Sequence, residues 1–322
     1  MDRINFYYGA QNQYEDVTDV VKKRCCMDNI IGIHKNDYKN LFCNYSAGDH
    51  KHLKVNIPYQ HIGPVYIKNE TSFTLNLNHF NTMPPIHIVY FINTFISPYY
   101  ENLMRTHLEE LIATGLCKYG TLYVEACGSD FAKIKKIVYS VLPTARVTCH
   151  SENNHEYFGI RKVWQLAQKN AGVVLYFHSK GISKLHLTPR NPYESRYLFP
   201  LVIKQWRRNI SLMMMFESIN KLGISAGGLG WIWMNYMWAK CSYLRKVERP
   251  IITERRHYYE DWISRKLSNI APNDTPGYDC FSLVYSVKNN LYHIGSTSSP
   301  KELFSILKKR KNVDKVRYWY KN

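Results

Sequence analysis

From Pro85 onward, strand-like and helix-like segments alternate along the chain, and this alternation restricts the fold more than any other feature of the sequence. Continuous apolar, β-branched runs predict strands at 86–94, 120–127, 145–150 and 171–179. Segments with helical periodicity and capping residues lie between them, at 99–114, 129–142 and 153–170. This order predicts an α/β fold, a sandwich with a mainly parallel central sheet and helices on both faces.

The first 80 residues have a different pattern. Short strand-like pieces such as "INFYYGA", "IIGIH", "HLKVNI", "PVYIKN" and "SFTLNLN" alternate with turn residues. The pair Pro84-Pro85 marks a joint, because adjacent prolines continue neither a helix nor a central strand. We therefore expect a small β-rich domain at 1–80 and an α/β domain at 85–322.

Three segments follow the fourth strand. We expect a long helix at 198–222, a glycine- and tryptophan-rich segment at 223–244, and a charged helix at 253–267, followed by a looser C-terminal region.

Charge and composition narrow the class of partner. The chain has 43 Lys and Arg against 25 Asp and Glu, a formal charge of +18, which favours an anionic partner: nucleic acid, a phosphorylated molecule, an acidic glycan or a membrane surface. No export signal and no run of about 20 apolar residues is present, and the eight cysteines include no C-x-x-C pair. A cytoplasmic protein with reduced thiols is the expectation.

The predicted strand at 171–179 ends in polar residues, His178 and Ser179, which Lys180 and Gly181 follow directly. In parallel α/β sheets, ligands bind beyond the carboxyl ends of the strands. A lysine there neutralises a phosphate, a serine donates to an oxygen, and glycine lets the backbone approach closely. The alternative is an ordinary solvated turn.

Other candidates lie further along the chain. Aromatic rings and polar groups between Gly227 and Tyr243 have the character of a sugar- or base-binding surface, or of a tryptophan-rich core layer. Glu260 and Asp261 are adjacent on a predicted helix, where neighbours point about 100° apart, so one of them at most faces a site.

The order of these pieces resembles a family. "HSKG" at a strand end, then "WR", "NYMWAKCSYL" and "YYEDWI", is similar to the motif order of GT-A-type glycosyltransferase-like proteins of giant DNA viruses and bacteria, over about residues 85–265. The "YG…DVT" pattern near the N-terminus resembles a β-rich accessory module that accompanies such proteins. Two positions depart from the family pattern: Met234 stands where glycine is common, and Gly159 where threonine is common.

The resemblance implies a transferase that moves a sugar from a nucleotide-sugar donor to a glycan or glycoprotein acceptor. Glu260 would be the catalytic base. The residues that would bind the donor diphosphate are His178, Ser179, Lys180, Gly181 and Arg207. Further substrate contacts would come from Glu156, Asn235, Trp238 and Lys240.

Metal dependence is open at this point. Such enzymes often hold Mn²⁺ or Mg²⁺ with a D-x-D motif, and this chain contains none. Either Lys180 neutralises the diphosphate directly, or His178 is a metal ligand. We favour the first.

Two further interpretations remain. In the first, the protein is a basic, non-catalytic binding protein for acidic glycan or nucleic acid on a transferase-like fold. In the second, it is an inactive transferase fold that works as a lectin-like module. No nucleic-acid-binding motif is present, and no nucleic acid is expected under the leading interpretation.

Overall fold

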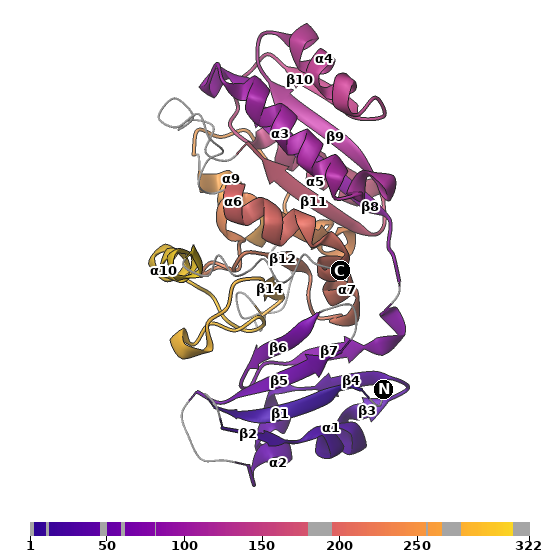
Figure 1. The fold of residues 1–322 in the computed structure, drawn as a ribbon, viewed down its shortest axis with the longest axis vertical. Helices are drawn as coiled ribbons and strands as arrows, with labels where there is room; N and C mark the ends of the chain where they lie inside the picture. Colours follow the sequence, from indigo (N-terminus) through magenta and orange to yellow (C-terminus); the bar gives the residue numbers. More distant parts are fainter. Residues whose placement is uncertain are drawn as a thin grey trace.

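The computed structural model describes residues 3–10, 13–45, 50–58, 62–80, 82–179, 195–255, 257–265 and 278–311. The N-terminal sheets lie at one end of the elongated molecule and the large sheet at the other (Figure 1). Among the described residues, no helix is long and apolar enough to span a lipid bilayer.

The predicted β-rich N-terminal region is confirmed as two small antiparallel sheets. The first has the strand order β2-β1-β5-β6, formed by β1 (Asn5–Ala10), β2 (Gln13–Asp16), β5 (His52–Ile57) and β6 (Gly63–Lys68). The second has the order β3-β4-β7, formed by β3 (Cys26–Met27), β4 (Ile30–Ile33) and β7 (Phe73–Asn76). Two helices that the sequence analysis missed, α1 (Thr18–Cys25) and α2 (Tyr38–Phe42), pack beside them.

The larger region has a seven-stranded sheet with the order β10-β9-β8-β11-β13-β12-β14. The predicted strands are confirmed as β8 (Ile86–Asn93), β9 (Gly120–Cys127), β10 (Arg146–His150) and β11 (Val173–His178), all mutually parallel. The remaining strands are β12 (Lys221–Gly223), β13 (Met237–Lys240) and β14 (Cys280–Ser282). Of these seven, only β13 runs opposite to the others. The α/β class with a mainly parallel sheet is therefore confirmed.

Helices cover both faces of this sheet because its strands bury side chains in both directions. Ile88, Tyr90 and Ile92 of β8 pack with the core of α3 (Tyr100–Ala113) and α4 (Phe131–Val141), while the alternate residues Val89 and Phe91 pack with α5 (Tyr157–Lys169). Figure 1 shows α3 lying across this sheet. The period of two along β8 places consecutive residues in opposite layers.

Gly159 sets the distance between α5 and the sheet. A Cβ at this position would lie 2.7 Å from the Cβ of Phe91 and 2.9 Å from the ring of Tyr176. At this position α5 approaches β8 and β11 too closely for a larger residue.

The long helix predicted at 198–222 is confirmed only in part: the segment is helical as far as Met215, with an interruption, and the prediction is wrong for 216–222. The chain forms α6 (Ser195–Leu198), a π-helical segment at Phe199–Lys204 and α7 (Trp206–Met215), and then enters strand β12. The Asn209 side chain donates to the backbone oxygens of Leu201 and Val202, both 3.0 Å away, and so satisfies carbonyls that a regular α-helix would bond within itself.

The charged helix predicted at 253–267 is shorter than expected, since α9 covers only His257–Asp261. The glycine- and tryptophan-rich segment contains β13 and the short helix α8 (Cys241–Leu244). The C-terminal region, expected to be looser, forms β14 and the helix α10 (Pro300–Lys311).

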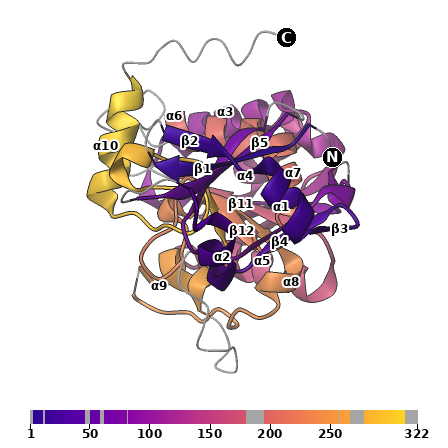
Figure 2. The ribbon, with the colours of Figure 1, turned by 90° about the horizontal axis from the view of Figure 1, so that it is seen from below.

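The N-terminal β-rich region, called the N-terminal module below, is joined to the rest of the protein by more than the chain at Pro84-Pro85. The backbone of His293 donates to the Tyr66 oxygen and its ring nitrogen accepts from the Tyr66 amide, each at 3.0 Å. The Arg208 guanidinium on α7 donates twice to the Ile62 oxygen, at 3.1 and 3.2 Å. Figure 2 looks from the end at which the N-terminal module lies, with the larger domain behind it.

Replacement of Gly159 tests the close approach of α5. We expect Gly159→Ala to lower the free energy of unfolding by about 1–3 kcal/mol, because the new methyl group overpacks the contact with Phe91. Denaturant unfolding followed by circular dichroism measures the change. Gly228→Ala is the control, because a Cβ there meets nothing within 4 Å. Equal stability of the two variants would contradict the packing argument.

Candidate functional site

The carboxyl ends of the parallel strands form one edge of the large sheet, and β13 brings Asn235 to that edge. In the antiparallel pairing of β11 and β13, Tyr176 lies opposite Met237 and Val173 lies opposite Lys240. The residues just before β13 therefore lie beside His178, and those at its end lie at the opposite edge of the sheet.

A hydrogen-bonded cluster around the Glu156 carboxylate lies at this edge. Its Oε2 accepts from the Asn235 amide at 2.6 Å and from the Tyr176 hydroxyl at 3.1 Å. Its Oε1 lies 3.5 Å from Nδ1 of His178. Glu156 directly precedes α5, where the positive end of the helix dipole favours a carboxylate. Three segments of the chain thus converge on one anionic group.

His178 is held by its ring and by its backbone. The ring Nε2 lies 3.1 Å from the Met234 oxygen, and the His178 oxygen accepts from the Tyr236 hydroxyl at 2.6 Å. The side chain is buried. Burial also raises the pKa of Tyr176 and Tyr236 well above the ordinary tyrosine value, so both hydroxyls stay protonated and able to donate.

The loop that carries Asn235 has an unusual backbone. Met234 and Asn235 have φ angles of +68° and +55°, in the left-handed region that glycine adopts without cost. This conformation gives a physical reason for glycine being common at position 234 in the resembled family. In this chain methionine occupies it, at a backbone cost of about 1 kcal/mol.

The two ring nitrogens of His178 have different partners. Nε2 faces the Met234 oxygen and is placed to donate to it, while Nδ1 lies 3.5 Å from Glu156 Oε1 and donates to it only when the ring is protonated. Within the described ranges, no group of three His, Cys, Asp or Glu side chains is arranged to hold a metal ion.

The remaining predicted site residues divide into two groups. Near the cluster, Ser179 is buried and its amide donates to the Phe91 oxygen at 3.0 Å. Glu260 lies on α9, next to Tyr259, whose backbone oxygen accepts from the Asn235 amide at 3.1 Å. The Glu260 carboxylate is 27% exposed and lies 3.6 Å from Nδ1 of His257. Lys180 and Gly181 lie outside the described residues.

Three predicted residues are not brought to this edge. Arg207 packs over the rings of Trp206 and Tyr119, and Tyr119 immediately precedes the amino end of β9. Trp238 is fully buried and donates to the Val202 oxygen at 2.7 Å, which makes it a core residue.

Lys240 also lies at the amino edge, opposite Val173. Its Nζ donates to the Glu217 backbone oxygen at 2.9 Å, and burial lowers its pKa to about 8. The motif by itself does not reveal that Asn235 and Lys240 lie at opposite edges of the sheet.

Sequence reasoning missed Tyr176 and placed Tyr236 only within the aromatic segment at 227–243. Nothing in their spacing indicates that their hydroxyls reach Glu156 and His178. Sequence reasoning also did not single out Asn93, which lies at the carboxyl end of β8 and donates to Asn153 at 2.6 Å. The signal in the sequence that could have identified Asn93 was its position at the end of a predicted strand.

Comparison with known proteins adds no relative: no family model matches the chain, and no curated protein matches it significantly.

Asn235→Asp tests the electrostatics of the cluster. The substitution puts a second carboxylate beside Glu156 and removes two hydrogen bonds, so we expect a loss of about 3 kcal/mol in unfolding free energy at pH 8. Two adjacent carboxylates raise the pKa of the pair, so the folded protein then binds a proton more tightly than the unfolded chain. The loss of unfolding free energy in Asn235→Asp, relative to the wild type, should therefore become smaller as the pH falls toward 5.

Urea unfolding at pH 8 and pH 5 measures this difference. Asn102→Asp, at an exposed position of α3, is the control and should change stability by no more than about 0.5 kcal/mol. A deficit of the same size at both pH values would rule out charge repulsion as its cause.

Proposed function

We propose that this protein is a nucleotide-sugar-dependent glycosyltransferase that moves a sugar to a glycan or glycoprotein acceptor. The observation that carries the proposal is the convergence of Glu156, His178 and Asn235. Consecutive members of this set are separated by up to 57 residues in the sequence. Their side chains nevertheless meet around the Glu156 carboxylate at the carboxyl edge of the sheet. Ligand sites of α/β sheets occupy that edge.

The cluster itself is suited to positioning. The Glu156 carboxylate is engaged with Tyr176, His178 and Asn235, so it fixes the strand end and the loop before β13. A rigid edge of this kind orients bound groups without reorganisation during the reaction. We assign Glu156 and Asn235 this positioning role.

On the donor side, Lys180 is the second residue after His178. Its ammonium would neutralise the negative charge that develops on the leaving diphosphate. Among the described residues no three potential ligands are grouped to hold a metal ion, so the proposal relies on this lysine. Arg207 is left out of the donor site, since it packs near the amino end of β9.

On the acceptor side, Glu260 is the candidate base. In the proposed step, an acceptor hydroxyl oxygen forms a bond to the anomeric carbon while the bond from that carbon to the diphosphate oxygen breaks. The hydroxyl proton passes to the Glu260 carboxylate, and the diphosphate leaves with the bonding electrons. The hydrogen bond from Asn235 to the Tyr259 oxygen links α9 to the cluster.

Sugar-nucleotide binding is the first test. A thermal-shift screen of sugar nucleotides, with and without manganese, should reveal a ligand that raises the melting temperature of the wild-type protein without metal. Lys180→Met should weaken its binding by about 1.5–3 kcal/mol, or on the order of 10- to 100-fold in Kd. Lys240→Met is the matched control, because this lysine lies at the opposite edge of the sheet, and its Kd should equal that of the wild type.

The same screen can overturn the proposal. A flat response of folded protein to every sugar nucleotide, together with strongly salt-dependent binding to heparin or nucleic acid, would favour the basic binding protein instead. A shift that requires manganese would replace the lysine assignment with a metal.

Catalysis is tested at two adjacent acids of α9. Glu260→Gln should lower kcat by about 10²- to 10⁴-fold and leave donor Kd unchanged, because it removes the proton acceptor only. Asp261→Asn should keep its activity, since the Asp261 carboxylate is paired with Arg265 at 3.0 and 3.2 Å. Equal activity of the two variants, measured as release of nucleoside diphosphate, would remove Glu260 from the mechanism.

A further inference from the structure

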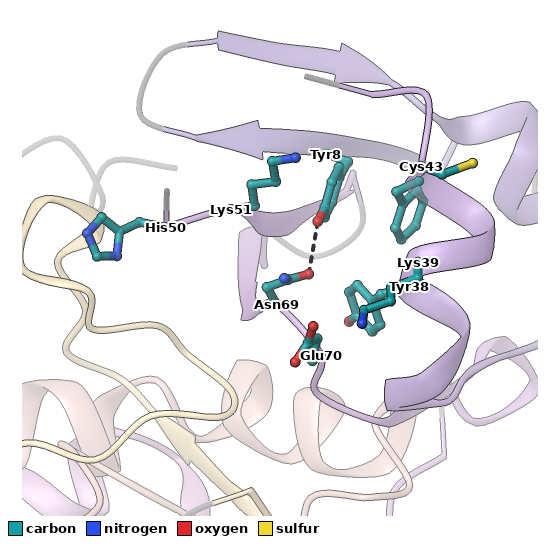
Figure 3. A pocket seen from close by; sticks show the side chains of 9 residues that line it. Tyr8, Tyr38, Lys39, Cys43, His50, Lys51, Asn69 and Glu70 are labelled. Carbon is teal, nitrogen blue, oxygen red and sulfur yellow. Dashed lines mark hydrogen bonds between the residues drawn. The ribbon is translucent and has the colours of Figure 1, made fainter. Parts of the chain in front are cut away.

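The N-terminal module contains a pocket with a volume of about 460 Å³. It opens between α2, the residues that enter β5 and the turn after β6 (Figure 3). Its size falls within the roughly 300–1,000 Å³ that is typical of small-ligand sites. The residues that line it are Tyr8, Tyr38, Lys39, Phe42, Cys43, His50, Lys51, Asn69 and Glu70.

Aromatic rings form an apolar base to this pocket. The rings of Tyr8 and Phe42 are stacked, with centroids 4.4 Å apart and planes inclined by 17°. Tyr38 packs against Phe42 at 5.6 Å and donates its hydroxyl to the Thr71 oxygen. All three rings are buried, so the base of the pocket is part of the hydrophobic core.

Neutral polar groups occupy one side. The Tyr8 hydroxyl donates to Oδ1 of Asn69 at 2.9 Å (Figure 3). Burial, and secondarily the charge of Glu70, raise the pKa of Tyr8 to about 12, so the hydroxyl remains a donor at neutral pH. With its oxygen engaged in this way, the Asn69 amide has its NH₂ group left to donate.

Charges of both signs stand around the opening. Lys39 and Glu70 are exposed, and Lys51 lies with its Nζ 3.4 Å from the Tyr45 oxygen and 5.9 Å from the centre of the Tyr8 ring. Among the residues that the structure describes, the Glu70 carboxylate has no ion-pair partner. The pocket thus offers ammonium and amide donors on the same rim as a carboxylate acceptor.

Glu70 occupies a backbone position that favours other residue types. It is the third residue of a turn closed by the hydrogen bond from the Thr71 amide to the Lys68 oxygen, and its φ is +59°. Glycine or asparagine is favoured at such a position. A glycine can therefore replace Glu70 without backbone strain, which makes this residue suitable for testing the pocket.

We propose that this pocket binds a sugar ring of the glycan acceptor. The proposal rests on the transferase function proposed above. A pyranose presents an apolar C–H face and hydroxyl groups that each donate and accept, and this pocket combines an apolar base with donors from Lys51 and Asn69 and an acceptor from Glu70. The Glu70 carboxylate disfavours phosphate, which two lysines alone would attract.

The pocket is also tied to the larger domain. The Tyr292 hydroxyl, from the segment after β14, donates to the His50 backbone oxygen at 3.3 Å. A glycan held here stays close to the transferase domain, which raises its effective concentration there without any contact to the reacting sugar. We therefore expect the pocket to increase transfer to extended acceptors and to leave donor binding unchanged.

Glu70→Gly is the decisive variant. Glycine relieves the left-handed backbone conformation, so the melting temperature should be unchanged or raised, while the carboxylate acceptor is lost. Asp28→Gly is the matched control: it also removes a carboxylate from a left-handed position, with φ +50°, in the turn between β3 and β4. It lies outside the pocket lining.

Binding is measured with the full chain by calorimetry and by ligand-observed NMR, using glucose, galactose, mannose, N-acetylglucosamine, glucuronate and, separately, inorganic phosphate. We expect the wild type and Asp28→Gly to bind at least one of these sugars, and Glu70→Gly to bind it at least tenfold more weakly at equal thermal stability. The proposal is overturned if none of the sugars binds, if Glu70→Gly binds equally well, or if phosphate is the ligand that binds.

These outcomes are separable from the donor tests. A sugar-nucleotide shift in the wild type without any free-sugar binding would overturn the pocket and leave the transferase standing. Free-sugar binding that depends on Glu70, together with a flat sugar-nucleotide screen, would keep the sugar pocket and overturn its role as an acceptor site.

Discussion

The geometry of the candidate site depends on the hydrogen bonds and the ion pair made by the Glu156 carboxylate. This carboxylate lies at the start of α5 and joins Tyr176 and His178 of β11 to Asn235 before β13. Partial burial of a carboxylate is costly unless hydrogen bonds compensate it, and here the donors come from a strand end and a loop that are distant in sequence. Because the helix dipole also favours the negative charge, one group positions both the helix and the loop at the sheet edge.

Two local features allow this arrangement. Gly159 brings α5 into direct contact with β8 and β11, which places Glu156 within reach of Tyr176. The left-handed conformation of Met234 and Asn235 turns the chain so that the Met234 oxygen meets the His178 ring and the Asn235 amide meets the carboxylate.

Much of the fold was predictable because its signals are local. Continuous apolar runs and helical periodicity identified four strands of the large sheet and the three helices between them, with element ends within about four residues of those observed, since burial on both faces leaves a clear pattern. The predicted helix at 198–222 failed over 216–222 for a tertiary reason. Its C-terminal part has helical composition, yet Lys221–Gly223 pairs with β13 and β14, and long-range pairing overrides local propensity.

For the site, the sequence by itself determined that polar residues end a buried strand, and therefore that His178 and Ser179 lie where α/β sheets bind ligands. Only the tertiary structure decided which downstream residues join them. Asn235 and Lys240 are five residues apart in one motif, but the antiparallel pairing of β13 with β11 places the first beside His178 and the second opposite Val173. The physical reason is that strand direction and register arise from contacts between distant segments, which neighbouring residues do not encode.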